Sequence, residues 1–288
     1  LMRLRQTSQT HQRVRQLRHF YQDVADGNLP EFTFLEPSYF DVKGQAATDQ
    51  HGGHDVSEGD KLIAQVYNAV RQSPLWNKVA LLVTYDEHGG FFDHRVPPSG
   101  PSPDGISSTD DPFDFTRLGV RVPAVIISPL VPKGAVFPAA PPNQGQYEHS
   151  SIAATVVHKL FSPKKGYKQP VYLTKRDAWA ATFEGVFSLS EPRTDCLSEA
   201  PTLAKSLREQ HPGSLPPLDG QQPLTDLQRE LLAICAGAAG DEAVQGRIVQ
   251  GETLEAVFHG WTEEQGSQYC QARLAASLLK ETLDVKAH

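Results

Sequence analysis

Apolar residues recur at helical spacing between residues 57 and 72, and short unbroken apolar runs follow later in the chain. The helical stripe consists of Leu62, Val66, Ala69 and Val70. Ser73-Pro74 ends it, because proline cannot continue a helix. The runs at 79–84 and 122–128 predict buried strands. A helix that leads into a buried strand indicates a βαβ unit, so we expect an α/β fold.

Weaker patterns predict the remaining elements of this part of the chain. We expect a short helix at 20–25, an alternating strand at 31–36, and helices at 150–161 and 176–187. Ser57 is expected to cap the helix that follows it, with two acidic residues in the first turn, where they favour the helix dipole.

The composition changes near residue 191. Prolines accumulate at 192, 201, 212, 216, 217 and 223 and predict a linker. Helical patterns return at 224–236 and at about 253–283. We therefore predict a large α/β part at 1–190, a proline-rich linker at 191–223 and a small helical appendage at 224–288.

The overall composition narrows the class of protein. With 39% hydrophobic and 21% charged residues, the 288 residues suit a globular domain with an appendage. A net charge of -7 argues against a general nucleic-acid binder. No apolar run approaches the ~18–20 residues of a membrane helix, and Leu1 opens no signal-peptide pattern. We expect a protein that is soluble or peripheral to a membrane, in a compartment that the sequence does not reveal.

Two adjacent carboxylates, Asp86 and Glu87, follow the apolar run at 79–84 and precede Gly89-Gly90. In open α/β sheets, ligands bind outside the carboxyl ends of the strands. Side chains of neighbouring residues alternate within a strand, but at a strand end both can reach one cation. Carboxylate oxygens suit Mg²⁺, Ca²⁺, Mn²⁺ or Zn²⁺. The pair therefore predicts a divalent metal site; the alternative is a solvated acid pair that ends a strand.

Histidines on two other segments extend this candidate site. His51 and His54 lie in a glycine-containing loop before the helix at 57–72, and such a loop can bind phosphate oxygens or shuttle a proton. His149 precedes a predicted helix N-terminus, where anions are favoured. The alternatives are loop-stabilising histidines at 51 and 54, and a surface histidine beside a helix cap at 149.

These residues lie within strings that together resemble the phosphoesterase family, closest to its plant-type non-specific phospholipases C. The family also contains bacterial phospholipases C and acid phosphatases. The matching strings are EPSYFD (36–41), DQHGGHDV (49–56), SPLW (73–76), TYDEHGGFFDH (84–94), FTRLGVRVP (115–123), EHSSI (148–152) and RDAWAATFE (176–184). The string PLTDLQREL (223–231) resembles the tail of the plant-type members, so the appendage fits as well.

The resemblance implies an alkaline-phosphatase-like α/β sheet flanked by helices, incomplete at the N-terminus, with a small helical C-terminal appendage. Residues 1–190 would then be the C-terminal part of the catalytic domain. By resemblance, Asp86 and Glu87 would bind the metal and His51 would face the phosphate, with His149 and His54 as further site residues. A phospholipid or another phosphate ester would be the substrate, with a membrane surface as a peripheral partner.

The chain departs from the family pattern in one respect. The family has an upstream Glu-Asn pair that binds metal and an upstream Ser or Thr nucleophile, and neither has a counterpart here. Thr48 and Ser150 offer hydroxyls, but nothing in the sequence marks either as a nucleophile. The resemblance thus implies a phospholipase C-type hydrolase whose nucleophile precedes Leu1. The alternatives are a phosphomonoesterase of acid-phosphatase type and an inactive chain that only binds metal or a partner.

Overall fold

The computed structural model describes residues 15–42, 44–107, 113–137, 140, 145–161, 172–201, 206–215 and 217–273. These residues fall into two compact units. The first unit comprises the described parts of 1–29, 33–69 and 199–288, and the second comprises 30–32 and the described parts of 70–198. The C-terminal helical segment therefore shares a unit with residues 33–69, which carry His51 and His54.

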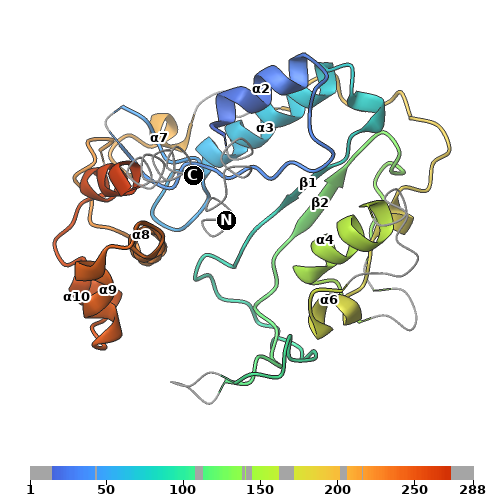
Figure 1. Cartoon of the computed structure of the whole chain (residues 1–288). Coiled ribbons are helices and arrows are strands. Elements are labelled where there is room, and N and C mark those ends of the chain that lie inside the picture. The colour runs from blue at the N-terminus through green and yellow to red at the C-terminus, as the bar shows by residue number, and fades with distance from the viewer. Residues whose placement is uncertain are drawn as a thin grey trace, which may run out of the picture. The chain divides into compact units, whose positions relative to one another are not determined.

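The described elements of the first unit are helices (Figure 1). They are α2 (Leu17–Ala25), α3 (Val56–Gln72, whose last turn lies in the second unit), α7 (Leu207–Gln210), α8 (Asp226–Ala239), α9 (Glu242–Val249) and α10 (Leu254–Val257), and residues 263–273 are also helical. The helices α8, α9 and α10 pack on one another. Their core is a cluster of four buried apolar residues, Leu224, Leu232, Val257 and Phe258.

Polar caps explain where these C-terminal helices begin and end. The Thr225 hydroxyl accepts from the backbone of Gln228, whose side chain in turn accepts from the Thr225 backbone, so α8 starts with a capping box. Asp241 and Thr253 are the N-caps of α9 and α10, and each side chain accepts one hydrogen bond from the backbone of the first turn. Gly240 ends α8 with a φ of 65°, a left-handed conformation that glycine adopts without strain.

The second unit contains a two-stranded sheet and short helical segments. Strands β1 (Leu81–Thr84) and β2 (Ala124–Ile127) pair antiparallel, with Leu81 opposite Ile127 and Thr84 opposite Ala124 (Figure 1). The helical segments are the 3₁₀ turns η2 (Trp76–Lys78) and η4 (Glu184–Val186), the helices α4 (Ser150–Ala154) and α6 (Lys175–Trp179), and the π-helical η3 (Thr155–Phe161). Helix α4 packs against α6.

The predicted βαβ unit is wrong, although both of its strands exist. β1 and β2 pair directly and antiparallel, so no parallel crossover joins them. An apolar run indicates an extended segment, and it carries no information on strand direction. The predicted burial is also wrong, because β1 is half-buried and Val125 of β2 is 54% exposed. The coarser prediction, that the chain combines helices with a sheet, is confirmed.

Several predicted boundaries also differ from the structure. Residues 31–36 form no strand, and Phe32 and Phe34 stay exposed. The helix expected at 150–161 is α-helical only to Ala154, and the helix expected at 176–187 ends at Trp179. The long helix expected at 253–283 is interrupted at 258–262, and its end lies outside the described residues. Residues 1–14 likewise lie outside the described residues.

The cap of α3 is Asp55 and not Ser57. Helix α3 begins at Val56, and the Asp55 carboxylate accepts from the Ser57 backbone at 3.1 Å and from its hydroxyl at 2.5 Å. An ionised acceptor outcompetes a hydroxyl for the positive end of a helix. None of the described helices has the length and apolar character that a bilayer crossing needs.

Candidate active site

The acid pair at the end of β1 lies in a tight, exposed turn. The Asp86 carboxylate accepts from the Glu87 backbone at 3.0 Å, and the Glu87 carboxylate accepts from the Gly89 backbone at 2.7 Å. Gly89 and Gly90 have φ values of 67° and 74°, which only glycine adopts readily. The two glycines thus let the chain turn directly after the acid pair.

His149 is bonded to the residue that precedes this acid pair. Its Nε2 atom donates to the carbonyl oxygen of Tyr85 at 2.8 Å. His149 is exposed and stands directly before α4, which begins at Ser150. The bond fixes Nε2 as the protonated nitrogen and leaves Nδ1 as an acceptor. Within the second unit, the structure therefore brings three predicted site residues together: Asp86, Glu87 and His149.

His51 and His54 lie in the first unit, on the loop before α3. His51 is half-buried, and its Nδ1 donates to the carbonyl of Gly52 at 3.0 Å, which leaves Nε2 as an acceptor. The backbone of His54 donates to the His51 carbonyl at 3.2 Å, so the loop is a closed turn.

His54 is buried, unlike His51. Its Nδ1 lies 2.6 Å from the carboxylate of Asp49, and its Nε2 lies 3.8 Å from the carboxylate of Glu263. Burial alone would lower the pKa of His54. The carboxylates of Asp49 and Glu263 outweigh this effect and raise the pKa from 6.5 to about 10. Its position among these groups is that of an internal cation. Glu263 could not be predicted as its partner, because 209 positions separate the two residues in the sequence.

Two groups of side chains offer ligands for a metal ion. The first is the Asp86–Glu87 turn, where no lysine or arginine of the described residues forms an ion pair with either acid. Each acid bonds a backbone N–H through one oxygen, and His88 Nδ1 lies 3.4 Å from the same oxygen of Glu87. The hard oxygens and the exposed position fit a divalent metal.

The second group consists of Asp41, His54 and Glu263, whose ligand atoms lie within 4.8 Å of one another. Hydrogen-bond donors already fill its centre. Glu263 Oε2 accepts from the Asp41 backbone at 2.5 Å and from Gln228 Nε2 at 3.1 Å. A cation would have to displace these donors as well as the proton on His54.

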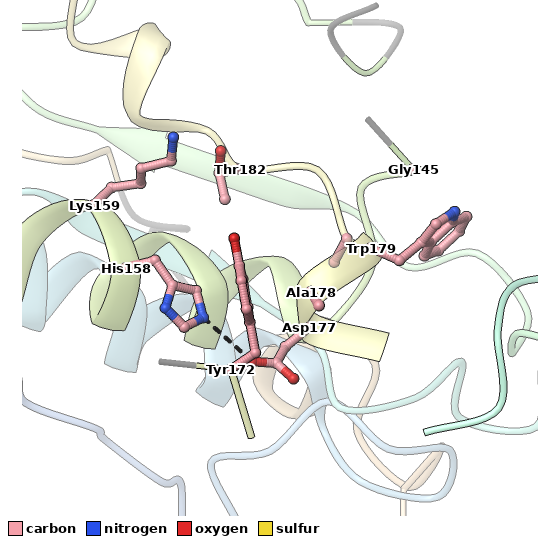
Figure 2. Close-up of a pocket in the computed structure, with 9 residues that line it drawn as sticks. Gly145, His158, Lys159, Tyr172, Asp177, Ala178, Trp179 and Thr182 are labelled. Carbon is pink, nitrogen blue, oxygen red and sulfur yellow. Dashed lines mark hydrogen bonds and ion pairs between the residues drawn. The ribbon is translucent and has the colours of Figure 1, made fainter. Parts of the chain in front are cut away.

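The second unit also contains a pocket of about 470 Å³ (Figure 2). It is lined by Gly145, His158, Lys159, Tyr172, Asp177, Ala178, Trp179, Ala180 and Thr182. Figure 2 shows His158 directed at Asp177, with 3.3 Å between Nε2 and Oδ2. None of the five predicted site residues lines this pocket. Asp177 belongs to the family-like string RDAWAATFE, and its carboxylate completes the capping box of α6, which is a structural role.

Comparison with known proteins gives these residues a context. The phosphoesterase family matches residues 2–162, more than half of the chain. The chain belongs to the phosphoesterase family. This confirms the resemblance drawn from the sequence strings, which lie partly within and partly beyond the matched residues.

Three relatives of this chain bear the name phospholipase C. The chain is 46% identical over 228 residues to "Non-specific phospholipase C6" of Arabidopsis thaliana, which covers 77% of this chain and 41% of the relative. It is 40% identical over 267 residues to "Non-specific phospholipase C1" of the same plant, covering 89% and 47%. It is 27% identical over 211 residues to "Non-hemolytic phospholipase C" of Burkholderia pseudomallei (strain K96243), covering 68% and 28%. The chain spans less than half the length of these relatives.

Proposed function

We propose that this chain forms part of a phospholipase C-type hydrolase, which cleaves a phospholipid into diacylglycerol and a phosphorylated headgroup. The observation that carries the proposal is the exposed Asp86–Glu87 turn with His149 fixed beside it. Its relatives bear the names of phospholipases C, and the family membership supports the same reaction class. An alkaline-phosphatase-like α/β sheet flanked by helices, with residues 224–288 as a small helical C-terminal appendage, belongs to this proposal.

In this proposal, Asp86 and Glu87 hold a divalent metal through their carboxylate oxygens. When bound, such a metal polarises a phosphoryl oxygen and lowers the pKa of a hydroxyl nucleophile. The other site residues act through their own ring nitrogens. His149 Nδ1 and His51 Nε2 are acceptors, and when protonated they donate to a phosphate oxygen or to the leaving group.

The nucleophile is proposed to come from a segment outside these 288 residues. Thr48 is a poor candidate, because its hydroxyl accepts from the Ser38 backbone at 2.9 Å and thereby holds the loop in shape. No bond ties the hydroxyl of either Thr48 or Ser150 to a histidine among the described residues. An upstream serine or threonine together with the Glu-Asn pair of the family would complete the site.

A lipid substrate is favoured over a soluble phosphomonoester by the apolar surface beside the turn. Phe91 and Phe92 follow Gly90 and are 62% and 92% exposed. Large apolar side chains at such exposure mark an interaction surface, and a lipid interface is one that a phospholipase must meet. The membrane surface is thus proposed as a peripheral partner, and nucleic acid is not.

The test uses the chain co-expressed with the upstream segment that is proposed to carry the nucleophile. Phosphorylcholine release from phosphatidylcholine vesicles is measured for the unaltered protein, Asp86→Asn and Glu87→Gln. We expect each substitution to reduce the rate by roughly 100-fold or more, because each removes a charged metal ligand. Glu191→Gln, at an exposed acid of the same unit, is the matched control and keeps full activity.

Comparing a chromogenic phosphodiester with the matching monoester separates the two enzyme classes. Preference for the diester supports the phospholipase, and preference for the monoester identifies a phosphatase at the same site. A chain that binds metal at the turn but turns over neither ester is the inactive alternative. Full activity in both acid variants would show that the metal assignment is wrong.

A further inference from the structure

The loop that carries His51 is closed by an ion pair between residues on either side of it. Asp49 Oδ1 and His54 Nδ1 lie 2.6 Å apart, and both side chains are more than nine-tenths buried. The second carboxylate oxygen of Asp49 is buried without a hydrogen-bond partner among the described residues. A carboxylate in this state has no other means of offsetting its charge, so its stability depends on the cation at His54.

The opposite edge of the same imidazole faces the C-terminal helices. His54 Nε2 lies 3.8 Å from Glu263, at the start of the helical segment 263–273, and 3.4 Å from the amide nitrogen of Gln228 on α8. The Gln228 amide donates to the Tyr39 carbonyl at 2.7 Å and to Glu263 at 3.1 Å. Both of its hydrogens are thus used at shorter distances than the one to His54.

The orientation of that amide is fixed by its other end. Gln228 Oε1 accepts from the backbone of Thr225 at 2.8 Å, so the nitrogen must face His54. With both amide hydrogens already engaged, His54 Nε2 has nothing to accept and keeps its own proton toward Glu263. Protons on both ring nitrogens make His54 an imidazolium.

The charges around His54 require this cation. Asp41, Asp49 and Glu263 face it from three segments of the unit, and Arg208 faces Asp41 at 3.6 Å. Three buried carboxylates near a single guanidinium leave an excess of negative charge that would be costly without a further cation. A positive His54 offsets one of these charges: it hydrogen-bonds to Asp49 at 2.6 Å and forms a longer ion pair with Glu263 at 3.8 Å.

We propose that His54 is a positioning residue that clasps the His51 loop to the C-terminal helices through Asp49 on one side and Glu263 on the other. The helices then set the geometry of a site residue that they do not themselves contribute. This inference rests on the proposed role of His51 in the reaction. It reassigns His54 from a group that meets substrate to one that acts through its neighbour.

The first test needs the 288-residue chain alone and no substrate. Labelled histidine allows the protonation of His54 to be followed by NMR as the pH is raised. We expect both ring nitrogens to stay protonated to about pH 9. One of the two protons should then be lost with a pKa of about 10. Titration near the ordinary value of 6.5 would overturn the proposal without any variant having to fold.

The second test asks whether the C-terminal helices control the loop. Glu263→Gln keeps the shape of the side chain and removes its charge. We expect it to lower the titration midpoint of His54 by at least one pH unit and to speed amide exchange at residues 49–55. Glu264→Gln is the matched control on the neighbouring residue, and it leaves both quantities unchanged. If amide exchange at residues 49–55 is unaltered in a folded Glu263→Gln chain, the proposed clasp is wrong.

A zinc titration separates the clasp from a metal site at Asp41, His54 and Glu263. Added Zn²⁺ at neutral pH should leave the His54 signals unmoved. If Zn²⁺ instead displaces the proton and shifts those signals, the cluster is a metal site and the clasp is wrong.

The third test measures catalysis in the co-expressed enzyme. We expect Glu263→Gln to reduce kcat roughly tenfold with KM little changed, and to shift the alkaline limb of the kcat profile to lower pH. If Glu263 only stabilised the fold, the substitution would lower the amount of folded enzyme. The alkaline limb of the kcat profile would then stay at the same pH. If the unaltered enzyme hydrolyses no phosphate ester, the proposed function fails, while the NMR and exchange results still decide the clasp.

Discussion

His149 Nε2 lies 2.8 Å from the backbone carbonyl of Tyr85, the residue directly before Asp86. The bond holds the start of α4 against the end of β1 and fixes which nitrogen of His149 carries the proton. We predict that His149→Ala lowers phospholipid hydrolysis about 100-fold, the range typical for loss of a proton-transferring group. The kcat of the co-expressed enzyme measures this. His211→Ala, at an exposed histidine of the other unit, is the control and should match the unaltered enzyme.

Metal binding at the Asp86–Glu87 turn can be measured on this chain without turnover. Calorimetric titration with Mn²⁺ should give one site that Asp86→Asn or Glu87→Gln weakens by roughly tenfold or more, because each change removes a charged oxygen ligand. The same titration on Asp41→Asn should be unaffected, since its carboxylate belongs to the other cluster. The reverse ranking would move the metal site to Asp41, His54 and Glu263.

The pKa of His54 predicts a specific loss of stability at alkaline pH. Burial opposes its charge, but Asp49 and Glu263 raise its pKa to about 10, against an ordinary value of 6.5. A group whose folded-state pKa is raised contributes its full stabilisation below 6.5 and loses it as the pH rises to about 10. We expect the free energy of unfolding to fall by a few kcal/mol across this window. Urea unfolding at pH 6, 8 and 10 measures it, and His54→Gln should flatten the dependence.

The core of the C-terminal helices offers a test of packing. Leu232 on α8 is fully buried in the cluster with Leu224, Val257 and Phe258. Leu232→Ala should reduce the free energy of unfolding by about 2–5 kcal/mol, through lost burial and the cavity that remains. Ile234→Ala, on the same helix but 53% exposed, is the control and should cost well under half as much. Equal losses for both would show that α8 does not pack as described.

Local patterns in the sequence were enough to predict the helix at α3, the strands at β1 and β2, and the start of α8. Each of these depends on spacing or caps within a few residues. The turn at Asp86 and Glu87 was also predicted, because an apolar run, two acids and two glycines are adjacent. The family membership followed from strings of the same short range.

Features that depend on distant residues could not be predicted in this way. The antiparallel pairing of β1 with β2 joins segments 40 positions apart, and periodicity does not encode strand direction. The burial of His54 depends on Gln228 and Glu263, whose own surroundings in the sequence look like ordinary helix surface. The end of α4 at Ala154 and the π-helical turn after it likewise reflect packing against α6, which no local pattern reports.

Gln228 is fully buried and uses both ends of its amide, so its lack of charge limits the negative charge in the interior of the unit. Burial already raises the pKa of Asp41 in the same cluster, because the interior disfavours its charged form. A glutamate of nearly equal size would add a further carboxylate and remove two donated hydrogen bonds at once. The change Gln228→Glu would thus place an additional negative charge in the interior, with almost no change in side-chain volume.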